Sequence, residues 1–257
     1  MPSAIRHHRE LSAKGLVVIL VEAQGADEPT LEHFLWKTFP DNECFSCVGT
    51  SVPLPASDGI PHAGLIGVDG TLLWAGNPLE NPKQVETLIE TELAKVKKGW
   101  GDTADARKVR AALYGKRDLG AAAKLVAALP EGDERTALQG EVDARWASAK
   151  QAIETLKQQG SWLKAQAAAK DLLKGVAGHA EWTTEATTIV AGFDTDEAKA
   201  ELAADKKLEK VVKMLRDKNL EGAPKALQAV LKGGAETKVG ARAQKLLKAL
   251  ETPLGKS

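Results

Sequence analysis

The chain has 257 residues, of which 43% are hydrophobic and 27% charged, and its 35 Lys and Arg balance 35 Asp and Glu. This is an ordinary globular composition, long enough for one large or two medium domains. Zero net charge argues against a general nucleic-acid or membrane-surface binder, and two cysteines exclude a disulfide scaffold. No apolar run approaches the roughly 18 residues of a membrane span, and no signal peptide is visible.

Charge and composition both change near residue 97. Residues 1–97 contain 7 Lys and Arg against 13 Asp and Glu, whereas residues 98–257 contain 28 against 22. The first part is rich in Pro, Gly and β-branched residues, and the second in Ala, Lys, Leu and Gln. We therefore predict an acidic α/β domain over 1–97 and a basic, all-helical domain over 98–257.

The first domain shows helices alternating with strands. Residues 2–14 predict a helix, and residues 16–21 form a continuous apolar run, which is typical of a strand buried on both faces of a parallel sheet. A second helix is expected to open at Asp27 or Glu28 and to end before Pro40. This alternation favours the α/β class.

The most informative segment covers residues 59–76. Two apolar runs flank Asp69-Gly70, which is a strong hairpin signal, and residues 81–96 have the apolar spacing of an amphipathic helix. The chain contains no phosphate-binding loop, dinucleotide fingerprint or Gly-x-Ser-x-Gly elbow, and no cofactor is predicted.

A Gly-Ile-Pro before an apolar strand, an Asp-Gly turn, a second strand ending in glycine and a closing helix together resemble the thioredoxin fold. The resemblance covers roughly residues 1–97 and is greatest to TlpA-like, redoxin-type thiol–disulfide oxidoreductases. It implies thiol–disulfide exchange with client proteins, with Ile60, Pro61 and His62 contacting the client and Pro61 in the cis form. His62 would then lie beside the redox site and tune a thiolate; the alternative is an ordinary residue at the start of the hairpin.

The sequence departs from this family at its beginning. In the family, a central strand and the catalytic Cys-x-x-Cys precede the position of Met1, so this chain is expected to be inactive or very weak as an oxidoreductase. Three alternatives stay open: Met1 is not the natural start, a segment such as 45–52 closes the sheet, or a partner supplies the strand. The first alternative implies a protein outside the cytoplasm, and the chain by itself implies a cytoplasmic one.

Cys44 and Cys47 form the one Cys-x-x-Cys of the sequence. A redox pair works because a helix N-terminus lowers the pKa of its first thiol, but the Val-Gly-Thr-Ser-Val-Pro-Leu-Pro that follows Cys47 cannot start a helix. An extended backbone would also point the two thiols to opposite faces. A redox pair and a structural pair both remain possible interpretations, whereas a zinc site would need two further ligands.

The second domain reads as helix after helix from Thr103 onward. Residues 113–126, 156–172 and 215–227 share a helix end, a short polar turn and a new helix that opens on small residues. This pattern resembles degenerate tetratricopeptide-type stacking of α-hairpins, which presents a surface to peptides or partner domains. A non-enzymatic interaction protein that uses these helices is therefore the alternative function. The expected N-caps are Thr103, Asp118, Ser161, Thr183 and Asp194.

Overall fold

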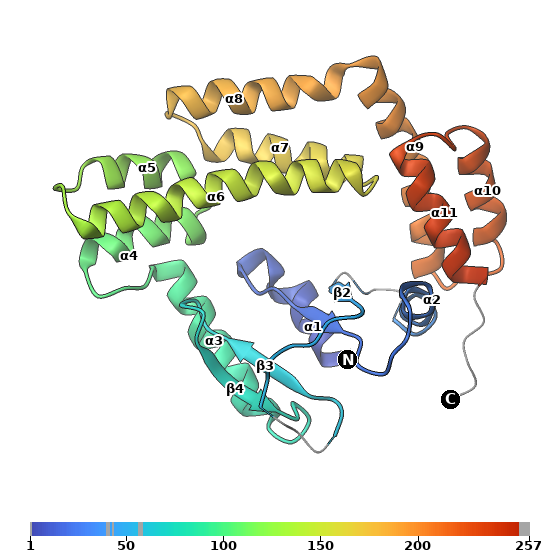
Figure 1. Cartoon of the computed structure of the whole chain (residues 1–257), viewed down its shortest axis with the longest axis horizontal. Helices are drawn as coiled ribbons and strands as arrows, with labels where there is room; N and C mark the ends of the chain where they lie inside the picture. The colour runs from blue at the N-terminus through green and yellow to red at the C-terminus, as the bar shows by residue number, and fades with distance from the viewer. Residues whose placement is uncertain (1, 40–41, 43, 56–58, 252–257) are drawn as a thin grey trace. The chain divides into compact units, whose positions relative to one another are not determined.

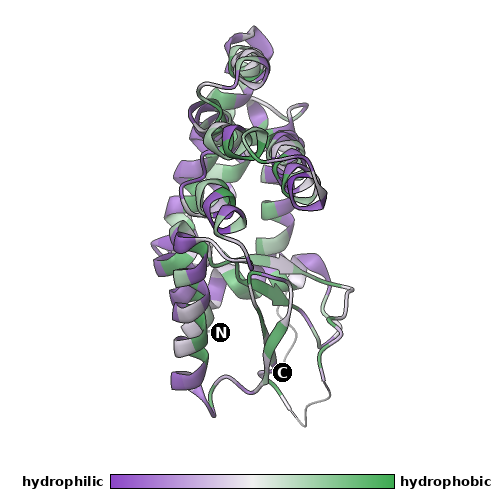
Figure 2. Cartoon of the chain, turned by 90° about the vertical axis from the view of Figure 1, so that its left-hand side faces the viewer, coloured by the Kyte–Doolittle hydropathy of each residue, from purple (hydrophilic) through white to green (hydrophobic). Residues whose placement is uncertain are grey.

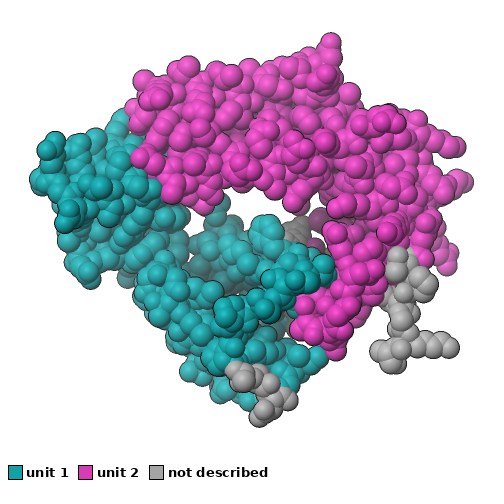
Figure 3. All heavy atoms as spheres, in the orientation of Figure 1, with its two compact units in different colours: residues 1–21, 43–142 teal, residues 22–42, 143–257 magenta. Residues whose placement is uncertain are grey.

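The structure is a computed structural model (Figure 1). It describes residues 2–39, 42, 44–55 and 59–251. The chain divides into two compact units (Figure 3). Unit 1 comprises residues 1–21 and 43–142, and unit 2 comprises residues 22–42 and 143–257. Within the described ranges, no helix is long and apolar enough to cross a bilayer.

Unit 1 contains two separate two-stranded sheets. Strand β1 (Ile19–Val21) pairs in parallel with β2 (Phe45–Cys47). Strand β3 (Ala63–Ile66) pairs antiparallel with β4 (Leu72–Gly76), and the turn between them contains Asp69-Gly70, so the predicted hairpin is confirmed. Residues 45–47 therefore pair with β1, but the two sheets are not joined through the described residues.

The helices of unit 1 are α1 (Pro2–Leu11), the 3-10 helix η1 (Ser12–Lys14), α3 (Pro82–Lys98), α4 (Ala104–Arg110), the π-helix η2 (Ala111–Gly115), α5 (Leu119–Ala127) and the first part of α6 (Asp133–Gln158). The predicted helices over 2–14 and 81–96 are confirmed by α1 with η1 and by α3. Thr103 and Asp118 cap α4 and α5 as expected, accepting hydrogen bonds from the backbone N–H groups of Ala106 and Ala121.

Helix α3 is tied to the β3–β4 hairpin by Glu92, which is 8% exposed. Its Oε2 accepts a hydrogen bond from the backbone N–H of Val68 at 2.9 Å, and its Oε1 lies 2.5 Å from the ammonium of Lys95. On another side of α3, Glu86 faces Arg6 of α1 at 3.5 Å. A single helix therefore contacts both the hairpin and α1.

Unit 2 contains α2 (Glu28–Thr38), the rest of α6, α7 (Trp162–Gly175), α8 (Ala180–Ala191), the 3-10 helix η3 (Gly192–Asp194), α9 (Asp196–Arg216), α10 (Ala223–Lys232) and α11 (Lys238–Glu251). The last three helices enclose an apolar core. Its large buried members are Leu208, Val211, Val212, Leu215, Leu227, Val230, Val239, Leu246 and Leu247.

Helix α2 was predicted within the α/β domain, but it lies against α11 in unit 2. Trp36 packs on the core of α9, α10 and α11, and Glu28 lies 3.8 Å from the ammonium of Lys245. Because α2 buries its apolar face on helices from the far end of the chain, each unit combines segments from before and after residue 97, and the domain boundary at that residue stays a prediction.

Candidate functional site

The residues that the resemblance assigns to client binding lie directly before β3. The Ile60–Pro61 peptide bond is cis, as that resemblance implied. The side chain of Ile60 is 68% exposed. His62 Nε2 lies 2.9 Å from the carbonyl oxygen of Pro55. A carbonyl can only accept, so Nε2 carries the proton and the ring is held by the preceding loop. Ile60 therefore faces solvent while His62 is fixed beside it.

The two cysteines lie at either end of β2 and form no disulfide with each other. Cys44 is buried, and the Sγ of Cys47 donates to the carbonyl oxygen of Leu20 on β1 at 3.7 Å. Neither thiol is at a helix N-terminus, where a positive dipole end would stabilise a thiolate. The candidate redox pair belongs to the β1–β2 sheet, whereas the residues from Ile60 to His62 lead into the other sheet.

Large apolar side chains are exposed on both sheets, and the strands are mostly green in the hydropathy colouring of Figure 2. We use the term strand surface for the exposed apolar residues on or next to the strands of these two separate sheets, namely Val17, Ile19, Phe45, Ile60, Ile66 and Leu72. It contains two cross-strand pairs, because Ile19 is opposite Phe45 and Ile66 is opposite Leu72. Such neighbours on adjoining strands present continuous apolar area.

The predicted burial of residues 16–21 on both faces is wrong. Ile19 and Val17 are each 61% exposed. The apolar run does indicate a strand. However, β1 pairs with β2 alone among the described strands, and the face of the run that includes Val17 and Ile19 is exposed to solvent. The sequence did not reveal the strand surface, because the same apolar pattern occurs in strands buried in a core and in exposed strands that bind a partner.

Each two-stranded sheet also leaves backbone edges that no described strand pairs. Exposed edges are usually blocked by charged side chains or proline. Residues 16–21 and 63–68 contain neither. An extended peptide segment can bind at such an edge. The unpaired backbone groups provide hydrogen bonds, and the exposed apolar side chains beside them provide contact area.

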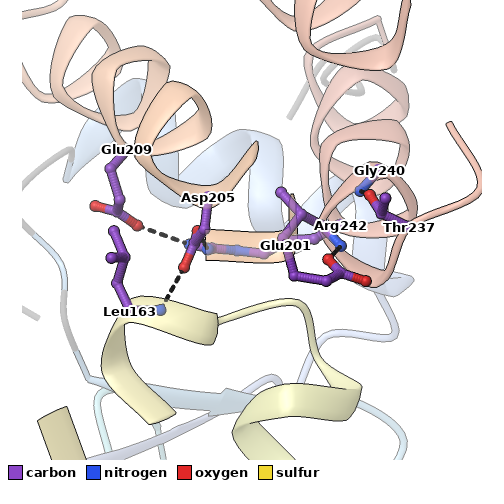
Figure 4. Close-up of polar contacts among 8 residues, drawn as sticks. Leu163, Glu201, Asp205, Glu209, Thr237, Gly240 and Arg242 are labelled. Atoms are coloured by element: carbon purple, nitrogen blue, oxygen red, sulfur yellow. Dashed lines mark hydrogen bonds and ion pairs between the residues drawn. The ribbon is translucent and has the colours of Figure 1, made fainter. Parts of the chain in front are cut away.

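A second cluster of polar residues lies in unit 2 (Figure 4). Asp205 on α9 accepts hydrogen bonds from the backbone N–H of Leu163 at 2.8 Å and from Arg242 on α11 at 3.1 Å. One turn away on either side, Glu209 pairs with Arg242 at 3.4 Å, and Glu201 accepts from the first two N–H groups of α11 at 2.8 and 3.1 Å.

These three carboxylates of α9 cap or pair with the neighbouring helices α7 and α11, so their oxygens are used in holding helices together. Burial raises the pKa of Asp205, against the opposing effects of the Leu163 N–H group and of Arg242. We therefore assign this cluster to stability. Among the described residues, no group of three or more His, Cys, Asp or Glu is placed to hold a metal ion.

A scan against protein-family models gave no match, and searches of curated proteins and of solved structures gave none. The candidate site therefore depends on the geometry of the strands. It consists of the strand surface, the adjoining backbone edges, and the loop from Ile60 to His62.

Proposed function

We propose that this protein is a thioredoxin-like module that binds extended segments of client proteins on its strand surface. The observation that carries the proposal is the pair of exposed cross-strand contacts, Ile19 with Phe45 and Ile66 with Leu72, beside uncharged strand edges. Fully burying one large aliphatic side chain is worth about 1.5–3 kcal/mol. Several such side chains can therefore offset the cost of ordering a client segment.

The loop before β3 supports the same proposal. Ile60 presents an apolar side chain beside the strand, and the hydrogen bond from His62 to Pro55 holds the loop against the chain. A client in extended conformation would add hydrogen bonds along a free edge, and its alternate side chains would contact the strand surface. Ile60 and His62 are among the residues that the family resemblance assigns to client binding.

Binding is tested with an unfolded polypeptide, for which reduced and carboxymethylated α-lactalbumin is a suitable probe. The double variant Ile66→Ser/Leu72→Ser should bind it at least about tenfold more weakly than the wild type, a loss of about 1.4 kcal/mol. The control Phe34→Ser removes an exposed aromatic ring from α2 in unit 2 and should change the affinity by less than about twofold. Equal weakening by both variants, with folding intact by circular dichroism, would contradict the proposal.

Disulfide chemistry is the activity that the resemblance implies for such a module. Cys44 is buried and Cys47 donates its thiol proton to a backbone carbonyl, so neither is set up as an attacking thiolate. We infer that this pair does not turn over client disulfides. Insulin reduction by the chain should match that of its Cys47→Ser variant. Robust turnover that disappears in this variant would overturn the inference and make the pair catalytic.

A further inference from the structure

A cavity of about 640 Å³ that is broadly open to solvent lies in unit 1, where the end of α3 meets α4, η2 and α5. Four cationic side chains line it, namely Lys98, Arg107, Lys108 and Lys116. The remaining wall is mostly alanine with Leu125, whose side chain is 36% exposed. The lining of the cavity is thus largely cationic and apolar.

The positive charges of this cavity are weakly compensated. Arg107 donates to the backbone carbonyls of Gly101 and Asp102 at 2.9 and 3.2 Å and keeps its charge. Lys108 pairs with Asp105 at 3.1 Å, but both side chains are about half exposed or more, and such pairs hold little energy.

The remaining charged residues of the lining are two further lysines and one carboxylate, so the positive charges stay in excess. Lys98 and Lys116 form no ion pair with any residue in the described ranges. The carboxylate on the wall, Asp118, accepts a hydrogen bond from the N–H of Ala121 at 2.8 Å and keeps its negative charge, so the lining has four cationic side chains against one anionic one.

The backbone at this cavity is also unusual. Helix η2 is a π-helix, with the N–H of Lys116 bonded to the carbonyl of Ala111 at 2.9 Å. Such turns are rare and occur frequently at functional sites. Gly115 allows η2 to approach α3, because a Cβ there would lie 2.8 Å from the carbonyl oxygen of Val96. Helix dipoles favour cations at the C-terminal ends of α3 and α4, and η2 continues α4 directly, so Lys116 at the C-cap of η2 also lies at a helix end.

We propose that this cavity binds a small amphipathic polyanion, a ligand with two or more phosphate or carboxylate groups on an apolar or aromatic body. Its volume falls within the roughly 300–1,000 Å³ of small-molecule sites. The lysines and Arg107 provide charge-assisted hydrogen bonds to the anionic groups, and the alanines with Leu125 contact the body. This site is separate from the strand surface, so either proposal can fail without the other.

The test titrates methylanthraniloyl-labelled ATP into the full chain without divalent metal. Unlabelled ATP should displace it better than tripolyphosphate, which has the charges alone, and better than adenosine, which has the body alone. The variant Lys98→Glu/Lys116→Glu should weaken binding at least about tenfold. The control Lys206→Glu/Lys210→Glu makes the same charge change at exposed positions of α9 and should weaken it less than about twofold.

A further variant separates the ligand's body from its charge. Leu125→Ser should lower the affinity for ATP and leave that for tripolyphosphate unchanged. Three outcomes would overturn the proposal. They are the absence of saturable binding, equal losses in the two charge variants, and displacement by tripolyphosphate as strong as that by ATP. Circular dichroism of each variant establishes that it is folded. We expect all of them to fold, because Lys98, Lys116 and Leu125 are exposed.

Discussion

The carboxylate of Asp205 on α9 and the guanidinium of Arg242 on α11 lie 3.1 Å apart, and the side chain of Asp205 is 1% exposed. The second oxygen of Asp205 accepts the backbone N–H of Leu163 at the start of α7 at 2.8 Å. One buried carboxylate therefore joins three helices of unit 2. Removing it leaves a backbone donor and a partly buried cation without their acceptor.

Asp205→Ala should lower the free energy of unfolding by about 3 kcal/mol, because breaking one side of a buried ion pair is costly. Urea unfolding followed by circular dichroism measures this loss. Arg242→Ala provides the matched partner for a double-mutant cycle. The double variant should lose less than the sum of the two single losses, and simple additivity would show that the two side chains are not coupled.

The pH dependence of Asp205→Asn follows from the same burial. The pKa of Asp205 is raised above its ordinary value of 3.8, chiefly because burial disfavours the charged carboxylate. The native state then binds a proton more tightly than the unfolded state, so this group's contribution to stability grows as the pH falls from the raised native pKa to 3.8. The asparagine variant lacks this titration.

The free energy of unfolding of the wild type, measured against Asp205→Asn, should therefore rise on acidification through that window. Urea unfolding of both proteins at a series of pH values between neutrality and about 4 gives the difference directly. A difference that stays constant, or that becomes smaller as the pH is lowered, would contradict the raised pKa of Asp205.

Glu92→Ala should destabilise unit 1 by about 1–3 kcal/mol, because it leaves the Val68 N–H without the acceptor that Glu92 provides at 2.9 Å. Glu92→Gln keeps an amide oxygen at the same place and should lose less. Lys95→Ala, which removes the exposed partner of Glu92, should cost less than Glu92→Ala. Amide hydrogen exchange should show faster exchange at Val68 in Glu92→Ala and near-native protection in Glu92→Gln.

Local signals in the sequence predicted local structure well. Asp69-Gly70 identified the β3–β4 hairpin, and the caps Thr103 and Asp118 located the starts of α4 and α5. Each depends on contacts within a few residues along the chain, so the necessary information is in the local sequence.

Other capping predictions were wrong. α8 is capped by His179 in place of Thr183, and α9 by Thr195 in place of Asp194. Histidine is not a usual cap, but here its Nδ1 accepts the N–H of Trp182 at 3.4 Å and its ring stacks on that tryptophan with ring centres 4.0 Å apart. This cap therefore combines a hydrogen bond with a ring contact three residues along the chain, in place of the Ser, Thr, Asp or Asn side chain that usually caps a helix.

The other features that the sequence did not predict depend on contacts between distant parts of the chain. The docking of α2 on α11, the Asp205 cluster and the exposure of Ile19 depend on which elements meet, and no local pattern encodes that choice. The apolar run at residues 16–21 illustrates the ambiguity, because it indicates a strand but does not say what covers it. For the same reason, the strand surface was not predicted, although every one of its residues is apolar.

The approach of α4 to the end of α3 gives a last prediction. Gly99 has a φ of +79°, and a Cβ there would lie 1.8 Å from the carbonyl oxygen of Arg107. Gly99→Ala therefore meets both an unfavourable backbone conformation and a clash with a helix backbone that cannot move freely. We expect it to lower the free energy of unfolding by at least about 2 kcal/mol.

Gly140→Ala is the matched control, because Gly140 lies within α6 and a Cβ there would have no atom within 4 Å. It should stabilise the protein by about 0.5–1 kcal/mol, since alanine is the better helix former. Urea unfolding of both variants tests the pair. If Gly99→Ala is as stable as the wild type, the close packing of α4 on the end of α3 is wrong, and with it the wall of the cavity that Lys98 and Arg107 share.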